Sequence, residues 1–210
     1  MSVLAPQIVR AHGAVTYLSS LSPTSTGSPS IGSDSWLAAG FYTGTNASGY
    51  MLNSIQLGMT DASGNPSGFA AMLYGQGDEV GAGLPGSSLG ALDSSLNPVT
   101  GDIFTYTPTS NITLSPTTHY FVILTSGTPL ADGVYNWSES IYPPSSSGAW
   151  SADNAVLHSG NGTSGWSPTP YLGIAQFAIN AIPIPEPSVL GLLGLGGWCF
   201  LWHRRKRVRL

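Results

Sequence analysis

The sequence predicts an all-β fold, an antiparallel jelly-roll-like β-sandwich, followed by one C-terminal transmembrane helix. The 210 residues include 27 Gly and 16 Pro but only 8% charged residues, whereas helical proteins usually need many Lys, Glu and Arg on their solvated faces. Short apolar runs alternate with turn-forming clusters from residue 36 onward, and no window longer than ten residues before residue 188 shows a clean helical period. An uncharged apolar run then covers residues 189–202.

Residues 1–33 are rich in Ser, Thr and Pro, a composition typical of a lead segment or linker. The β-sandwich domain is expected over residues 34–181, with eight or nine strands in two sheets. Turn clusters separate the apolar runs at 46–49, 61–66, 84–87, 132–133 and 159–162. The expected strands are 36–43, 51–59, 68–74, 103–106, 119–125, 134–138, 155–158 and 172–180.

Side-chain alternation supports two of these strands in particular. In 51–59, one face carries Met51, Ile55, Leu57 and Met59, with an interruption at Asn53. In 119–125, three apolar side chains share one face and two share the other, so we expect a central strand that is covered on both sides.

The run 189–202 is apolar throughout but short for a membrane crossing. As a helix it would span roughly 21 Å, whereas a full crossing needs about 30 Å. Trp198 and Trp202 lie where interfacial aromatic residues are common. The basic residues that follow predict a cytoplasmic stop, with the body of the chain outside. A buried helix of the domain is the alternative, although such helices alternate with polar positions. The stop comprises Arg204, Arg205, Lys206, Arg207 and Arg209.

The motif Pro185-Glu186-Pro187 precedes this run. Pro-Glu-Pro, then a Gly- and Leu-rich apolar helix, then an Arg cluster resembles the PEP-CTERM sorting signal of exopolysaccharide-producing Gram-negative bacteria. The resemblance covers residues 183–209, and we place the signal at 183–210 with its basic tail at 203–210. It implies that an exosortase, a membrane-embedded processing enzyme, recognises the three motif residues and that the tail is removed. Two prolines keep the backbone extended, and the carboxylate offers a contact for a basic pocket.

The first ten residues do not resemble a secretion signal. They contain no basic n-region and no long apolar run. Because an exported protein of this type carries a cleavable signal peptide, we expect the natural start to lie upstream of Met1. Export through the C-terminal helix alone is the alternative.

Residues 34–181 resemble the choice-of-anchor R type of domain, which occurs on exported proteins with several kinds of C-terminal anchor. The residues that carry the resemblance are core, turn and register positions. The family has no assigned biochemical activity, so the resemblance implies architecture and location, and no catalytic residue. The carrying segments are 36–41, 49–55, 66–69, 72–74, 85–90, 114–116, 120–121 and 135–137.

Two glycine motifs match catalytic or nucleotide-binding patterns by composition only. Gly86-Ser-Ser88-Leu-Gly90 fits G-x-S-x-G, but a nucleophile elbow needs a helix after it and none is indicated. Residues 160–165 fit G-x-G-x-x-G, yet Trp166-Ser-Pro168 follows where a helix should begin, which predicts a hairpin loop. We therefore expect no catalytic residue, and the chain is interpreted as a non-enzyme.

No metal or cofactor is expected. The four histidines lack metal-ligand spacing, and His119 is interpreted as a solvent-facing strand residue that could meet His158 across strands. Asp78-Glu79 and Asp132-Gly133 are weak candidates for calcium because the sequence has no Asp-x-Asp series. Outside its basic tail the chain carries one basic residue, Arg10, against ten acidic ones, which excludes nucleic acid as a partner. The single Cys excludes a disulfide framework.

Three functions are compatible with these features. The first is a non-catalytic surface or extracellular-matrix protein that an exosortase-type enzyme processes and that associates with exopolysaccharide or biofilm matrix. The second is a lectin-like carbohydrate-binding module, in which exposed indoles stack on sugars. The third is a hydrolase on a jelly-roll scaffold. The candidate stacking residues are Trp137, Trp150 and Trp166, with core packing as the alternative for each.

Overall fold

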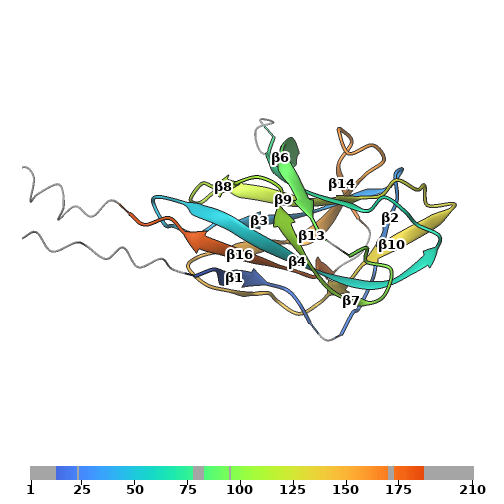
Figure 1. Cartoon of the computed structure of the whole chain (residues 1–210), viewed down its shortest axis with the longest axis horizontal. Helices are drawn as coiled ribbons and strands as arrows, with labels where there is room; N and C mark the ends of the chain where they lie inside the picture. The colour runs from blue at the N-terminus through green and yellow to red at the C-terminus, as the bar shows by residue number, and fades with distance from the viewer. Residues whose placement is uncertain (1–12, 23, 78–82, 95, 170–172, 187–210) are drawn as a thin grey trace, which may run out of the picture.

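The structure is a computed structural model that describes residues 13–22, 24–77, 83–94, 96–169 and 173–186. All regular secondary structure in these ranges is β-strand, which confirms the all-β prediction (Figure 1). None of the described residues forms a helix with the length and apolar character needed to cross a membrane. The predicted transmembrane helix at 189–202 and the basic tail lie outside the described residues.

The strands vary widely in length, from two residues to the fifteen of β4. In chain order they are β1 (Val15–Ser19), β2 (Ser30–Ile31), β3 (Trp36–Tyr42), β4 (Tyr50–Gly64), β5 (Ala70–Gln76), β6 (Pro85–Asp93), β7 (Asp102–Pro108), β8 (Thr113–Leu114), β9 (His119–Thr125), β10 (Gly133–Trp137), β11 (Glu139–Ser140), β12 (Ser145–Ser146), β13 (Ser151–Ser159), β14 (Ser167–Pro168), β15 (Ile174–Ala175) and β16 (Phe177–Pro183).

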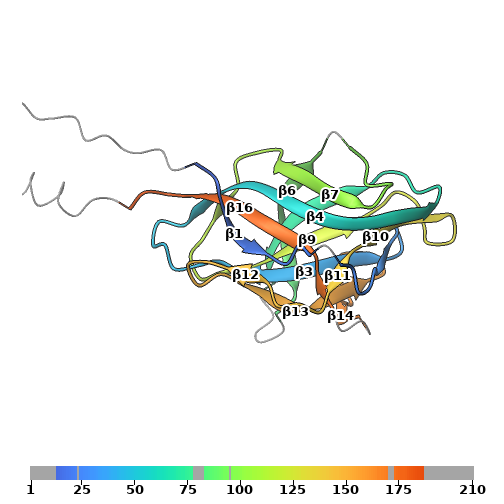
Figure 2. The same cartoon turned by 90° about the horizontal axis from the view of Figure 1, so that it is seen from below.

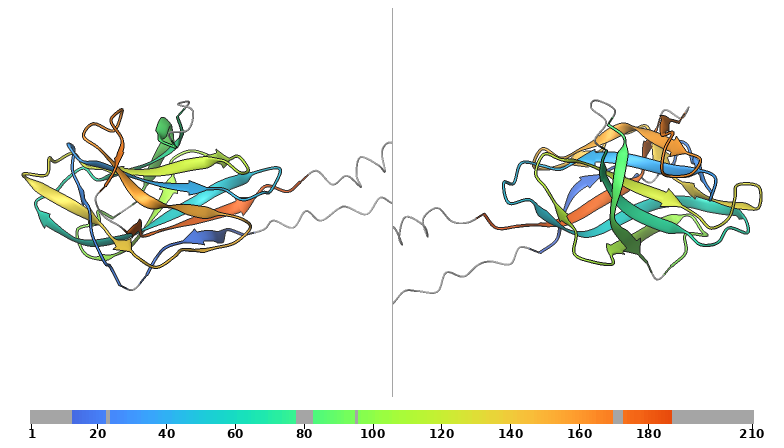
Figure 3. Two further views of the ribbon diagram at one scale, coloured as in Figure 1. Left: turned by 180° about the vertical axis from the view of Figure 1, so that it is seen from behind. Right: turned by 90° about the horizontal axis from the view of Figure 1, so that it is seen from above.

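Nearly all strands belong to one strongly curled antiparallel sheet, a half-barrel (Figure 3). Its main path runs β12-β1-β16-β4-β7-β6-β5-β9-β3-β13-β14, while β8 and β10 pair with β4, and β2 with β10. The sequence suggested two sheets, but a short pairing of β6 with β7, at Leu92 opposite Pro108, joins the two halves. Strands β11 and β15 form a separate two-stranded sheet.

The inner faces of the two halves enclose one apolar core, so the arrangement is sandwich-like (Figure 2). Phe41 of β3, Leu57 of β4 and Phe177 of β16 are each at most 1% exposed. Phe177 lies between the two halves, with its ring centroid 6.3 Å from that of Phe41 and 6.4 Å from that of Trp137. Each aromatic side chain of this kind removes about 150–250 Å² of surface from water, so these residues contribute strongly to the stability of the core.

A β-bulge in β4 changes which side chains face this core. Along the β4–β16 pairing, Asn180 lies opposite Ser54 but the next residue lies opposite Leu52, so Asn53 is the extra residue. A bulge shifts the alternation of the strand by one position. Leu52 is therefore 4% exposed and Met51 is 40% exposed, so the placement of Met51 on the core face is wrong. The apolar alternation of residues 51–59 is interrupted in the sequence at this same residue, Asn53.

Three segments that were expected to be irregular contribute strands. Within the expected lead, β1 pairs with β16, and Leu18 and Ile31 are fully buried. The expected turn at 84–87 instead begins β6, whose Gly- and Ser-rich sequence lacks an apolar face. The expected turn at 61–66 begins only after β4 ends at Gly64.

The prediction of a central strand at 119–125 is confirmed in both bounds and burial. All seven residues of β9 are buried, and the strand lies between β5 and β3. Its outward side chains Phe121 and Ile123 belong to a second, smaller apolar cluster together with Ala38 and Trp166. The sheet is thus covered on both faces at this point.

Replacing Phe177 with Ala should lower the free energy of unfolding by about 3–5 kcal/mol, because the change leaves a cavity between the two halves of the sheet. Urea unfolding followed by tryptophan fluorescence measures this loss. Leu96→Ala is the matched control, since Leu96 is 64% exposed, and should change stability by less than about 0.5 kcal/mol. Equal midpoints for the two variants would contradict the assigned core.

Candidate functional site

The described chain runs into the Pro-Glu-Pro motif directly from the last strand. Strand β16 ends at Pro183, which lies opposite Tyr50 at the start of β4. Pro185 and Glu186 are described and exposed, whereas Pro187 lies outside the described residues. The motif therefore begins two residues after a paired strand residue, next to the turn that precedes β4.

That turn, Asn46–Gly49, was predicted from its composition and is confirmed. The Gly49 amide donates to the Asn46 carbonyl at 2.8 Å. Gly49 has a φ of 77°, a left-handed conformation that glycine adopts without the penalty of a Cβ. A Cβ there would overlap the carbonyl oxygen of Leu114, so the position also needs glycine for space.

The turn bonds the outgoing chain through both backbone groups of Ile184. The Ile184 amide donates to the Gly49 carbonyl at 3.0 Å. The side-chain amide Nδ2 of Asn46 donates to the Ile184 carbonyl at 3.0 Å and to the Gly49 carbonyl at 2.6 Å. One asparagine side chain thus holds the turn and the outgoing strand together.

Glu186 itself reaches the same turn. Its Oε1 accepts a hydrogen bond from the Ala47 amide at 3.3 Å. The sequence indicated both the turn and the motif but carried no sign that they touch, because 139 positions separate them along the chain.

A histidine–aspartate pair lies on the outer face of the other half of the sheet. His119 of β9 is 4% exposed, and its Nε2 lies 2.9 Å from Asp153 Oδ2 of β13. The pair crosses β3 above Gly40, where a Cβ would overlap both atoms. The expectation that His119 faces solvent is therefore wrong, because the neighbouring strand lacks a side chain at this position and lets the carboxylate reach it.

Tyr42 completes this outer cluster. Its ring stacks on the imidazole of His119 with centroids 4.1 Å apart and an interplanar angle of 4°, and the residue remains 41% exposed. The Nδ1 atom of His119 is buried without a hydrogen-bond partner among the described residues. His158 does not contact His119. On β3, His158 lies opposite Leu37 and His119 lies opposite Tyr42, and these two positions are about 17 Å apart along the strand.

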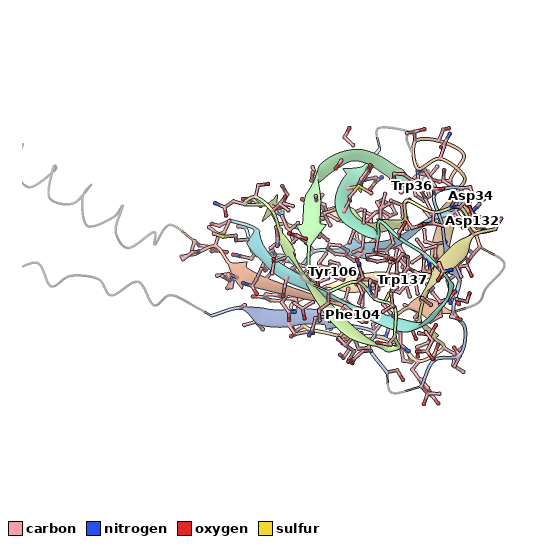
Figure 4. All side chains as sticks on the ribbon, turned by 45° about the vertical axis from the view of Figure 1, so that its right-hand side comes forward. Asp34, Trp36, Phe104, Tyr106, Asp132 and Trp137 are labelled. Atoms are coloured by element: carbon pink, nitrogen blue, oxygen red, sulfur yellow. The ribbon has the colours of Figure 1, made fainter. Side chains whose placement is uncertain are left out.

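The three candidate stacking tryptophans are not surface residues. Trp137 and Trp150 are 0% and 2% exposed. Trp166 is 9% exposed and belongs to the second, smaller apolar cluster on the outer face of β9. Trp137 donates from its indole nitrogen to the Gln176 carbonyl at 3.0 Å, and Figure 4 shows it among packed side chains. Their large apolar area fills the space between strands, so the stacking role assigned from sequence is wrong for these positions.

The two motifs that resembled catalytic patterns lie in plain β structure. Ser88 of the G-x-S-x-G match is a paired residue inside β6, opposite Tyr74, and not a turn before a helix. The G-x-G-x-x-G match forms the loop between the antiparallel strands β13 and β14, which confirms the hairpin interpretation. Gly162 in this loop adopts a φ of 70° and lies against the ring of Trp36.

No group of three or more potential metal ligands occurs among the residues that the structure describes. Asp78 and Glu79 lie outside those residues. Asp132 and Asp34 lie at the end of the domain far from the exit of β16 (Figure 4). Asp34 Oδ1 accepts from the Leu130 amide at 2.9 Å, so this carboxylate holds a loop.

Glu139 is a buried carboxylate with no basic partner in the described ranges. It is 1% exposed, and its Oε1 has no hydrogen-bond partner there. All six Lys and Arg residues of the chain fall outside the described ranges. Gly27 and Gly173 flank the carboxyl group and leave it room. Burial raises the pKa of Glu139 above its ordinary value, because a charged carboxylate loses its hydration here.

Comparison with known proteins identifies one segment. The model of the PEP-CTERM protein-sorting motif matches residues 183–206, which confirms the sorting signal expected there. The match contains Pro185, Glu186 and Pro187 and the first three basic residues of the tail, Arg204, Arg205 and Lys206. No curated protein and no solved structure matches the chain. The signal indicates an exported protein that an exosortase-type enzyme recognises and processes.

Replacing Glu139 with Gln should make the domain more stable at neutral pH relative to the wild type. A raised folded-state pKa stabilises the fold below the ordinary value of 4.5, and this contribution is lost as pH rises through the folded value. The variant cannot ionise and avoids that loss. Urea midpoints at about pH 4 and about pH 8 measure the difference, and Asp93→Asn, at an exposed site, is the control. A variant advantage that shrinks toward alkaline pH would contradict the assignment.

Proposed function

We propose that this chain is a non-catalytic β-sandwich protein of the Gram-negative cell surface or extracellular matrix, delivered there by processing at its C-terminal signal. The observation that carries the proposal is the sorting motif at 183–206, which follows the last strand with no spacer. Before processing, the segment 189–202 anchors the chain in the membrane, and the basic residues after it act as the stop. The domain is a choice-of-anchor R type of domain in this proposal.

The position of the two described chain ends supports a surface role. Val15 at the start of β1 lies opposite Ala181 near the end of β16, so residues 13 and 186 lie at the same end of the domain (Figure 1). An anchor that follows residue 186 would hold this end near the membrane and direct the opposite loops outward.

The absence of catalysis is part of the proposal and rests on local chemistry. A general base must reach a proton of a bound substrate. His119 is the described residue closest to such a role, but Asp153 occupies one ring nitrogen and the other is buried. Ser88 lies in a strand, and its pairing partner in β5 is Tyr74, not a base. The contacts of His119 and Asp153 above Gly40 therefore support a structural role for this pair.

A second function, contact with the matrix polysaccharide, is favoured by Tyr42. The ring of Tyr42 is exposed and is fixed by its stacking on His119, which Asp153 in turn holds. A ring that is already ordered loses little conformational entropy when it stacks on a sugar. The side chain of Asp153 is 30% exposed and offers an acceptor for a sugar hydroxyl beside the ring. With the tryptophans buried, Tyr42 takes the stacking role proposed for a lectin-like module.

Replacing Glu186 with Ala should impair processing and leave the full-length form in the membrane, because the motif loses its only charged group. Mass spectrometry of the protein recovered from membrane and surface fractions measures the C-terminus. Asp93→Ala, at an exposed carboxylate far from the motif in sequence, is the control. A chain lacking residues 189–210 should appear in the exported soluble fraction. A mature wild-type pool that still ends at Leu210 would refute the proposal.

Replacing Tyr42 with Ala should weaken binding to the host exopolysaccharide by at least about threefold, since one aromatic stacking contact is worth that much. Isothermal titration with the purified polysaccharide measures the affinity. Tyr142→Ala is the matched control, because Tyr142 is 57% exposed in the loop that follows β11, away from strand β3 that carries Tyr42. Equal affinities of the two variants and the wild type would exclude Tyr42 as a contact.

A further inference from the structure

We infer that the Asn46–Gly49 turn is a latch that holds the sorting motif on the folded domain and slows its capture by the processing enzyme. This inference rests on the proposed function of the motif. We call this turn the motif latch. Its contacts are the three described above, from Gly49 and Asn46 to Ile184 and from Ala47 to Glu186.

The first step of the argument concerns the backbone. Enzymes that act on peptides commonly bind them as an extended segment through main-chain hydrogen bonds. Both backbone groups of Ile184 are already bonded to the latch, its amide to Gly49 and its carbonyl to Asn46. An enzyme that binds this residue in the same way must first break these two bonds.

The second step concerns the carboxylate. Glu186 is the charged group of the motif, and its Oε1 is bonded to the Ala47 amide. A basic pocket of the enzyme and the latch therefore compete for the same carboxylate. The bond is exposed and 3.3 Å long, so it favours the closed state only modestly.

The third step concerns reach. Pro183 is still paired with Tyr50 of β4, and Pro185 begins the motif one residue after Ile184. Two residues extend by at most about 7 Å, which is less than the width of a folded strand pair with its side chains. The enzyme cannot surround the motif while Ile184 stays bonded to the turn at the end of β16, so residues 184–186 must first detach locally before capture.

Asn46 is the residue whose chemistry the latch requires. Its side-chain amide supplies two donors, one to the Gly49 carbonyl and one to the Ile184 carbonyl. Aspartate has the same shape but no donor, and its charge would also repel Glu186. The sequence signature of the turn tolerates Asn, Asp or Ser, so the double donation is what sets this asparagine apart.

The experiment follows processing of the full chain in cells that contain the exosortase, by pulse labelling and mass spectrometry of the C-terminus. Asn46→Ala should be processed about three to ten times faster than the wild type, the range expected for loss of one or two hydrogen bonds. Asn65→Ala is the matched control, an exposed loop asparagine with no described side-chain bond, and should match the wild type.

A second variant keeps the test decisive if Asn46→Ala does not fold. Insertion of Gly-Ser-Gly-Ser between Ile184 and Pro185 leaves the Asn46 and Gly49 bonds intact and moves the motif away from the sheet. It should also be processed several times faster than the wild type. An unchanged or slower rate for this insertion, or for a folded Asn46→Ala variant, would overturn the latch.

Amide hydrogen exchange separates the latch from the proposed function, because it needs no enzyme. In the full chain, Glu186→Ala should speed exchange at Ala47, and Asn46→Ala should speed exchange at Ile184. Unchanged exchange at both amides would refute the contacts in solution. Normal processing of Glu186→Ala, together with the expected exchange changes, would instead refute the sorting role of the motif while the docked contact stands.

Discussion

Backbone pairing along β4 is the constraint on which the rest of the fold depends. This strand pairs with β16 on one side and β7 on the other, and its ends also take up β8 and β10. The turn Asn46–Gly49 leads directly into its first residue, Tyr50, which lies opposite Pro183. The register that assembles the core therefore also fixes where the chain leaves the sheet and which turn it touches on leaving. The pairing of β4 with β16 thus builds the core and also places the sorting motif next to the turn.

The domain holds together with almost no help from charge. All six Lys and Arg residues lie outside the described ranges, and within those ranges the one contact between a basic and an acidic side chain is that of His119 with Asp153. Stability therefore comes from apolar burial and from the strand ladder, which depend little on salt. Glu139 is buried with no cation among the described residues to offset its lost hydration, and this burial raises its pKa. Acidic groups are otherwise mostly at loops and strand ends, where water solvates them.

The outer face of β9 and β3 carries a cluster of polar and aromatic groups with a fixed geometry, formed by His119, Asp153 and Tyr42. Gly40 makes this cluster possible, because the missing side chain lets Asp153 cross β3 to His119. Tyr42 then lies flat on the imidazole with its other side exposed. The arrangement orders an exposed aromatic ring on a strand, without a loop to hold it.

The sequence by itself determined the β class, the bounds of β9 and the sorting motif. A strand that is buried on both faces is a continuous apolar run, and a sorting signal is a linear pattern, so both are local properties. Only the tertiary structure decided that a bulge at Asn53 turns Met51 outward, that Trp137 and Trp150 fill the core, and that a Gly- and Ser-rich segment forms β6. The contacts of Asp153 with His119 and of Ala47 with Glu186 join residues 34 and 139 positions apart. Strand pairing creates such contacts, and pairing between distant segments leaves no periodic mark on either one.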